Sequence, residues 1–147
     1  MQIYIGSDHA GYKLKQEIKK HIEEKEGFEI TDLGSFKEES VDYPDIVHEV
    51  ADKVFEYPGS IGIMICGTGQ GSCMAANKEK GIRAALCTNE YMAVKAREHN
   101  HANFLCLGER VTGPGVAVGI VDKFLETSFD ESERHVRRVK KIGRKKN

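Results

Sequence analysis

Short apolar runs alternate with longer amphipathic segments along the chain, and this alternation limits the possible fold more than any other feature of the sequence. The apolar runs predict five strands, at residues 2–6, 28–33, 61–65, 82–87 and 104–107. The other segments predict helices at residues 12–25, 42–57, 72–78, 89–100, 114–127 and 131–141. This order indicates an α/β protein: a Rossmann-like three-layer α/β/α sandwich with a five-stranded, mainly parallel sheet.

The chain of 147 residues is expected to form one domain, residues 1–147, with a basic C-terminal helix and tail at about residues 131–147. It shows no linker, internal repeat or low-complexity segment. No apolar run approaches the roughly 20 residues that a membrane span requires. The first residues lack the features of a signal peptide, so we expect a cytoplasmic protein with no membrane partner.

Positive charge is concentrated at the C-terminus. Residues 134–147 contain eight Lys or Arg and no acidic residue, although the net charge of the whole chain is −1. A basic tail can bind nucleic acid, but a solvated helix end beside an acidic body has the same composition. We favour the solvated helix end for Arg144, Lys145 and Lys146, and we expect no nucleic-acid partner.

A glycine-rich loop, CGTGQG at residues 66–71, follows the third predicted strand and precedes a helix. Its backbone N–H groups and the helix N-terminus together predict an anion site. Two further polar segments, at residues 7–9 and 108–110, also follow predicted strands. Ligands of parallel sheets bind outside the carboxyl ends of the strands, so we expect the functional site where these three segments lie.

The spacing of this loop differs from that of three common phosphate loops. A Walker loop ends in Gly-Lys-Ser/Thr, whereas this loop is followed by Ser72-Cys73. A dinucleotide fingerprint is G-x-G-x-x-G after the first strand, whereas this loop is G-x-G-x-G after the third. A thiolate phosphatase needs arginine six positions after its cysteine, and that position is Ser72.

Cys66 is the cysteine best placed for chemistry. Helix N-terminal amides favour a thiolate, which could take a proton from a carbon beside a carbonyl. The same amides and the Thr68 hydroxyl could stabilise the resulting enediolate oxygen. A buried cysteine that only ends a strand is the alternative that the residues leave open. We expect Cys73, Cys87 and Cys106 to be packing residues, since their spacing suits no zinc site.

Several cationic residues are candidates for holding a phosphate. Arg134 and Arg138 are four residues apart, so they share one helical face and suit a phosphate dianion. His9 and Arg110 follow strands and could complete the anion site. Asp8 could then accept hydrogen bonds from substrate hydroxyls. Each of these residues could instead be an ordinary surface group.

His99 and Asn100 close the fourth predicted helix. A histidine at this position often interacts with the last helical carbonyls. It could also protonate a sugar ring oxygen and open the ring.

Seven motifs occur in one order along the chain: SDHAG, DYPD, CGTGQG, AANK, GIRAAL, REHNHAN and ERHVRRV. As a set, from residue 3 to about residue 139, they resemble the ribose-5-phosphate isomerase B family, which is related to galactose-6-phosphate isomerase. The galactose enzymes divide these motifs between two unlike chains, whereas this chain carries all of them. Another branch of the family uses a glutamate at the position of Ala75, so Cys66 identifies the cysteine type.

The resemblance implies an aldose–ketose isomerase that needs no metal or cofactor and works through an enediolate. Cys66 would move the proton between C1 and C2, Thr68 would belong to the anion hole, and His99 would open the furanose ring. The implied substrate-binding residues are Asp8, His9, Gly67, Gly69, Gln70, Gly71, Asn100, Arg110, Arg134 and Arg138. The resemblance also implies a homodimer with active sites shared between the chains, in some members paired into a tetramer.

The predicted reaction is therefore the interconversion of D-ribose 5-phosphate and D-ribulose 5-phosphate, a step of the pentose phosphate pathway. Two alternatives stay open. The substrate could be a six-carbon sugar phosphate, such as allose 6-phosphate or galactose 6-phosphate. The chain could also be a phosphate-binding module without catalysis. Gln70 and residues 72–74 depart from the small and aliphatic residues expected in many relatives, but they remove no proposed catalytic group.

Overall fold

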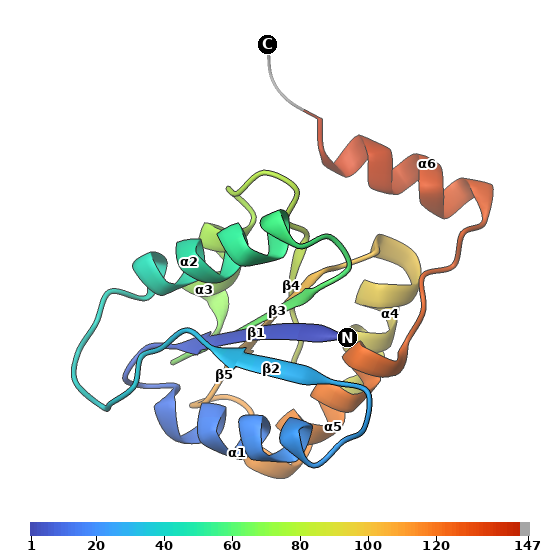
Figure 1. Cartoon of the computed structure of the whole chain (residues 1–147). Coiled ribbons are helices and arrows are strands. Elements are labelled where there is room, and N and C mark those ends of the chain that lie inside the picture. The colour runs from blue at the N-terminus through green and yellow to red at the C-terminus, as the bar shows by residue number, and fades with distance from the viewer. Residues whose placement is uncertain (145–147) are drawn as a thin grey trace.

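The computed structural model describes residues 1–144 and contains a five-stranded sheet with the order β2-β1-β3-β5-β4 (Figure 1). The strands are β1 (Gln2–Ser7), β2 (Glu29–Asp32), β3 (Ile61–Cys66), β4 (Ala84–Leu86) and β5 (Phe104–Gly108). The helices are α1 (Tyr12–Glu23), α2 (Tyr43–Glu56), α3 (Gln70–Ala76), α4 (Glu90–Asn100), α5 (Pro114–Glu126) and α6 (Glu133–Ile142). All four pairs of neighbouring strands in this sheet are parallel, which sharpens the prediction of a mainly parallel sheet.

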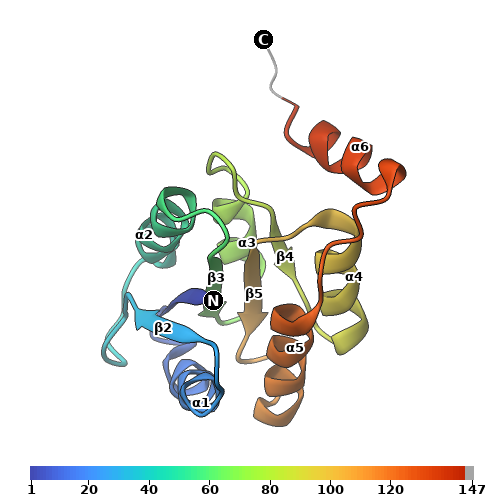
Figure 2. The ribbon, with the colours of Figure 1, turned by 45° about the vertical axis from the view of Figure 1, so that its right-hand side comes forward.

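Helices cover both faces of the sheet, so the predicted three-layer sandwich is confirmed (Figure 2). On one face, α1, α4 and α5 pack against alternate strand residues such as Ile5 and Ile63. On the other face, α2 and α3 pack against the intervening residues, among them Met64 and Phe104. Every residue of β3 is buried, as expected for a central strand covered on both sides.

The predicted ends of the elements are close to the observed ones. Asn89 caps α4 as expected, because its side-chain oxygen accepts a hydrogen bond from the Met92 N–H at 2.9 Å. The prediction for α3 was wrong by two residues, since the helix begins at Gln70 instead of Ser72. Gly69 has a φ of 79°, and this left-handed conformation turns the chain directly from the loop into the helix.

Helix α6 extends away from the rest of the molecule and packs against α4 (Figures 1 and 2). His135 is its one buried residue. The end of the basic tail, which includes Lys145 and Lys146, lies outside the described residues. Within residues 1–144, no helix combines the length and the apolar character that crossing a membrane would require.

Candidate active site

The carboxyl ends of three neighbouring strands bring the predicted segments together. Strand β3 lies between β1 and β5, and Cys66 is paired in register with Gly108. Backbone hydrogen bonds tie the segments to one another beyond the strands. The Asp8 N–H donates to the Ile65 carbonyl at 3.2 Å, and the Arg110 N–H donates to the Gly67 carbonyl at 3.0 Å. Asp8, His9, residues 66–71 and Arg110 therefore lie at one edge of the sheet, as predicted.

The sulfur of Cys66 points into the glycine loop. The side chain is buried, with 4% of its surface exposed, and its Sγ accepts a hydrogen bond from the Gly69 N–H at 3.2 Å. At the exposed tip of the loop, the Thr68 hydroxyl accepts a longer hydrogen bond, 3.4 Å, from the Gln70 N–H. The hydrogen bond from Gly69 holds the Cys66 sulfur at the base of the loop, beside the backbone N–H groups.

Two glycines let other groups approach this loop closely. A Cβ atom on Gly108 would lie 2.5 Å from the carbonyl group of Thr68, a distance that forbids any side chain. A Cβ atom on Gly71 would lie 2.3 Å from the Tyr43 hydroxyl. The loop therefore fits against the end of β5 on one side and against α2 on the other.

Tyr43 is a candidate site residue that the sequence analysis missed. The DYPD motif was interpreted as a helix start, and Tyr43 is indeed the first residue of α2. Its hydroxyl, however, is directed at Gly71, which puts a phenol beside the proposed anion loop. An aromatic residue with a polar tip just inside a helix start was the available signal, but nothing in the sequence connects it to residues 66–71.

The polar side chains of this edge differ in burial. Asp8 is 6% exposed, and one of its oxygens accepts a hydrogen bond from the Gly11 N–H at 3.0 Å, which fixes the carboxylate. His9 is exposed, and its Nδ1 accepts a hydrogen bond from the Val41 N–H at 3.4 Å. The Arg110 guanidinium is exposed and lies over Gly67. A fixed carboxylate beside an exposed imidazole and an exposed guanidinium suits a ligand that has hydroxyls and an anionic end.

The other predicted site residues lie elsewhere in the chain. Helix α4 follows β4 and runs back across the sheet, so His99 and Asn100 lie at the amino edge, where β5 begins. The His99 ring stacks on His135 of α6, with ring centroids 4.3 Å apart. Within one chain, these residues do not meet Cys66.

Arg134 and Arg138 are both exposed, four residues apart on α6. Arg137, between them, is exposed and lies 3.9 Å from the Glu133 carboxylate, as is typical of a surface residue. No ion pair with a carboxylate within residues 1–144 involves Arg134 or Arg138. Both guanidiniums are therefore available to an anion, but they project from α6 and away from residues 66–71 of the same chain.

The remaining cysteines differ more than the sequence suggested. Cys87 and Cys106 are buried, which raises the pKa of Cys87 to about 12 and raises that of Cys106 well above its usual value. Cys73 is half-buried, and a hydrogen bond with the Cys106 thiol is the main cause that lowers its pKa to about 7. Cys73 therefore ionises more easily than the two buried thiols.

Within residues 1–144, no group of three or more His, Cys, Asp or Glu is arranged to hold a metal ion. The carboxyl edge brings together the thiol of Cys66, the glycine loop and the side chains of His9 and Arg110.

A thiol and a glycine loop at the carboxyl edge of an open parallel sheet define an α/β protein with a candidate active site for an anionic ligand. Residues 3–142 match the family described as Ribose/Galactose Isomerase, and the chain belongs to that family. It is an enzyme of the aldose–ketose isomerase class. The prediction of a sugar-phosphate isomerase is thereby confirmed at the level of the family.

Solved structures and curated sequences agree with this assignment. A ribose-5-phosphate isomerase B from Clostridium thermocellum is 54% identical, with a TM-score of 0.91, covering 97% of this chain and 95% of that one. A type B ribose 5-phosphate isomerase from Trypanosoma brucei is 45% identical, with a TM-score of 0.91 and coverage of 97% and 96%. A ribose-5-phosphate isomerase B from Mycobacterium tuberculosis is 40% identical over 140 residues, which cover 95% of this chain and 86% of the relative.

Proposed function

We propose that the protein interconverts D-ribose 5-phosphate and D-ribulose 5-phosphate through an enediolate, with Cys66 as the base. The observation that carries this proposal is the position of the Cys66 sulfur, which is buried at the carboxyl edge and accepts the Gly69 N–H. Its surroundings supply groups for the rest of the substrate, because Asp8 and Arg110 flank the same loop. The names of the relatives agree with this substrate.

The proposed chemistry is a proton transfer between neighbouring carbons. The Cys66 thiolate removes the proton from C2 of the open-chain aldose, and the electron pair moves through the C1–C2 bond to the C1 oxygen. Backbone N–H groups of residues 67–71 and the Thr68 hydroxyl stabilise the resulting oxyanion. Cys66 then returns the proton to C1, while the proton of the C2 hydroxyl passes to the C1 oxygen, which leaves a ketone at C2 and a hydroxyl at C1.

Ring opening and part of the phosphate binding require groups that this edge lacks. His99 is proposed to protonate the ring oxygen, and Asn100 to hold a hydroxyl. Arg134 and Arg138 would bind the phosphate together with His9 and Arg110. Because the α4 and α6 residues lie far from Cys66 in their own chain, we propose that a second subunit supplies them, in a homodimer with shared active sites.

The decisive experiment measures ketose formation from ribose 5-phosphate with a chelator present. Cys66→Ala should lose at least about 1,000-fold in kcat and still bind the substrate, because only the base is removed. Cys73→Ala is the matched control, since it removes a nearby thiol and should keep turnover within about threefold of wild type.

Three other outcomes would contradict parts of the proposal. Equal turnover in wild type and Cys66→Ala would move the base to another residue. Turnover of allose 6-phosphate but not of ribose 5-phosphate would show that the substrate is a six-carbon sugar phosphate. Binding without turnover of either sugar in the wild type would indicate a phosphate-binding module.

A further inference from the structure

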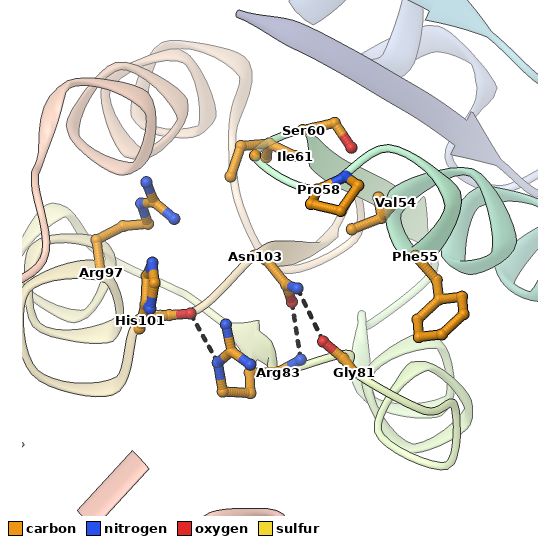
Figure 3. A pocket seen from close by; sticks show the side chains of 11 residues that line it. Val54, Phe55, Pro58, Ser60, Ile61, Gly81, Arg83, Arg97, His101 and Asn103 are labelled. Carbon is orange, nitrogen blue, oxygen red and sulfur yellow. Dashed lines mark hydrogen bonds between the residues drawn. The ribbon is translucent and has the colours of Figure 1, made fainter. Parts of the chain in front are cut away.

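A cavity of about 350 Å³ lies at the amino edge of the sheet, the edge opposite Cys66 (Figure 3). Its apolar side comes from the end of α2 and the turn into β3, with Val54, Phe55, Pro58 and Ile61. Its polar side comes from the starts of β4 and β5 and the end of α4, with Arg83, Arg97, His101 and Asn103. The length of the central strands separates this cavity from the glycine loop.

Two guanidiniums line the cavity without a carboxylate partner. The Arg83 Nε donates to the His101 carbonyl at 2.8 Å, and an Arg97 Nη donates to the Ala102 carbonyl. Both are bonded to backbone oxygens, and no ion pair among the residues described, 1–144, includes either of them. The Nε of Arg97 is buried and has no hydrogen-bond partner. The Arg97 guanidinium lies over the Phe124 ring, 5.4 Å from its centroid, so this wall of the cavity has two positive charges that no carboxylate among residues 1–144 offsets.

The electrostatics of the cavity favour an anion. Burial lowers the pKa of both guanidiniums, and the charge of Arg83 lowers that of Arg97 further. His101 is part of the same cluster: its pKa is lowered by burial and by both arginines, against a smaller opposite effect of Glu131. An anion bound between Arg83 and Arg97 would reduce the repulsion between the two guanidiniums.

The walls are held in fixed positions. The Asn103 side-chain oxygen accepts a hydrogen bond from the backbone N–H of Arg83 at 2.8 Å, and its amide nitrogen donates to the Gly81 carbonyl at 2.9 Å. These bonds fix the Asn103 side chain in the cavity wall. His101 has a φ of 50°, and its ring stacks on Phe129 with centroids 4.5 Å apart. A preformed cavity avoids part of the cost of ordering a site on binding.

We propose that this cavity binds a small organic phosphate monoester, with its phosphate at Arg83 and Arg97 and its less polar body against Phe55 and Pro58. Planar guanidiniums match the oxygens of a phosphate in pairs. A volume of this size with one apolar wall exceeds the need of a bare inorganic ion and is typical of small-molecule sites. Figure 3 shows the arginines on one side of the cavity and Phe55 and Pro58 on the other.

The proposed isomerase site uses other groups. Arg97 lies in the last turn of α4 and His101 is the left-handed residue that ends the helix, and both line the cavity. His99 lies on another side of α4 and stacks on His135 of α6. Binding in the cavity is therefore expected whether or not Cys66 and His99 act as proposed.

The test is a titration of the isotope-labelled full chain with phenyl phosphate, followed by amide NMR shifts. The amides of Ser60, Gly81 and Arg83 should shift and saturate with a Kd below about 10 mM. The amides of Gly67 and Gly69 report separately on the proposed active site, so the two sites are distinguished in one experiment.

Variants at the cavity mouth test the role of charge. Phe55 is exposed, so Phe55→Glu places a carboxylate beside the ligand without altering the core. It should weaken binding at the cavity by at least about fivefold and leave the shifts of Gly67 and Gly69 unchanged. Phe55→Gln removes the ring without adding a charge, so it should weaken binding by about two- to threefold, and the further loss in Phe55→Glu measures the effect of the carboxylate. Arg83→Gln should weaken binding by about tenfold.

Three results would overturn the proposal. The first is no shift of the cavity amides up to about 10 mM phenyl phosphate. The second is an equal Kd in wild type, Phe55→Glu and Phe55→Gln. The third is inorganic phosphate binding as tightly as phenyl phosphate, which would mean that the apolar wall contributes nothing and that the ligand is no organic phosphate.

Discussion

Cys66 and His99 lie at opposite edges of the same parallel sheet. Cys66 is the last residue of β3, at the carboxyl edge, whereas His99 is in the last turn of α4, next to the start of β5. Because α4 must return to the amino edge before the parallel strand β5 begins, this separation is a consequence of the topology. A reaction that uses both residues on one substrate needs two copies of the chain.

Mixed subunits should regain activity lost in each variant alone. Cys66→Ala and His99→Ala chains, unfolded together and refolded, should form hybrid dimers with one intact site of two. Random pairing then predicts about a quarter of wild-type activity. A control mixture of Cys66→Ala with the Cys66→Ala/His99→Ala double variant should stay inactive. No recovery in the first mixture would mean that one chain supplies both residues, or that the chains do not share sites.

Gly108→Ala should displace the glycine loop, which packs against the end of β5. The new Cβ atom would lie 2.5 Å from the Thr68 carbonyl group, which belongs to rigid backbone. We expect a loss of about 2 kcal/mol in the free energy of unfolding. Displacement of the loop should lower kcat/KM by about 100-fold.

Gly115→Ala is the matched control for Gly108→Ala. A Cβ atom there meets nothing within 4 Å, so stability and kcat/KM should be close to those of wild type. The two can be compared by urea unfolding and by steady-state assays. A fully active Gly108→Ala enzyme would show that the position of Thr68 is not critical.

Iodoacetamide at pH 7 should label Cys73 in the native protein. Its pKa of about 7 provides thiolate, and the side chain is half-buried. Cys87 and Cys106 should stay unlabelled until the protein is denatured, because burial raises the pKa of both thiols. Peptide mass spectrometry over time would give the order in which the cysteines are alkylated. Cys73→Ser should remove the first adduct. A first adduct on Cys106 would contradict the structure.

Lys15 should be important for stability, because its side chain is fully buried and lies 2.7 Å from Asp32. Burial lowers the pKa of the ammonium, and the hydrogen bond to Asp32 opposes that shift. Lys15→Ala leaves the Asp32 carboxylate without its main partner, so the free energy of unfolding should fall by about 3 kcal/mol.

Neutralising both members of the Lys15–Asp32 pair should cost much less. In Lys15→Met/Asp32→Asn, no unpaired charge stays buried, and the amide oxygen can still accept the Gly34 N–H that Asp32 now accepts. We expect the double variant to lie within about 1 kcal/mol of wild type in urea unfolding. If Lys15→Ala and the double variant are equally destabilised, the unpaired Asp32 charge is not the cause, and the lost hydrogen bonds of the Lys15 ammonium are.

Protonation of the Asp122 carboxylate should lower the free energy of unfolding in acid. Burial raises the pKa of this carboxyl, but hydrogen bonds from His21 and Lys25 outweigh burial, and the pKa lies below its usual value. The stabilisation is therefore complete above about pH 4 and is lost as the pH falls through the lower pKa of the folded state.

The variant Asp122→Asn should be about 0.5–1 kcal/mol less stable than wild type at pH 7. The difference should narrow toward zero at about pH 2–3, where the wild-type carboxylate is protonated. Asp52→Asn, at an exposed position of α2, is the control and should change little at either pH. A difference that stays constant with pH would exclude the charge of Asp122 as the cause.

Local patterns in the sequence determined the elements of this fold. The apolar run of β3, the capping Asn89 and the stop at Pro58 each act within a few residues, so they can be interpreted without tertiary information. The carboxyl-edge site followed from the same patterns, because parallel strands all end at one edge. The resemblance to the family then assigned expected roles to the residues there.

Only the tertiary structure decided which distant groups meet. Lys15 belonged by its pattern to the solvated part of α1, yet it is buried against Asp32 from the next strand. Arg83 and Arg97 share a cavity because β5 lies between β3 and β4, an order that no local pattern encodes. Such contacts arise when elements pack, and the energies that select among packings are summed over the whole core.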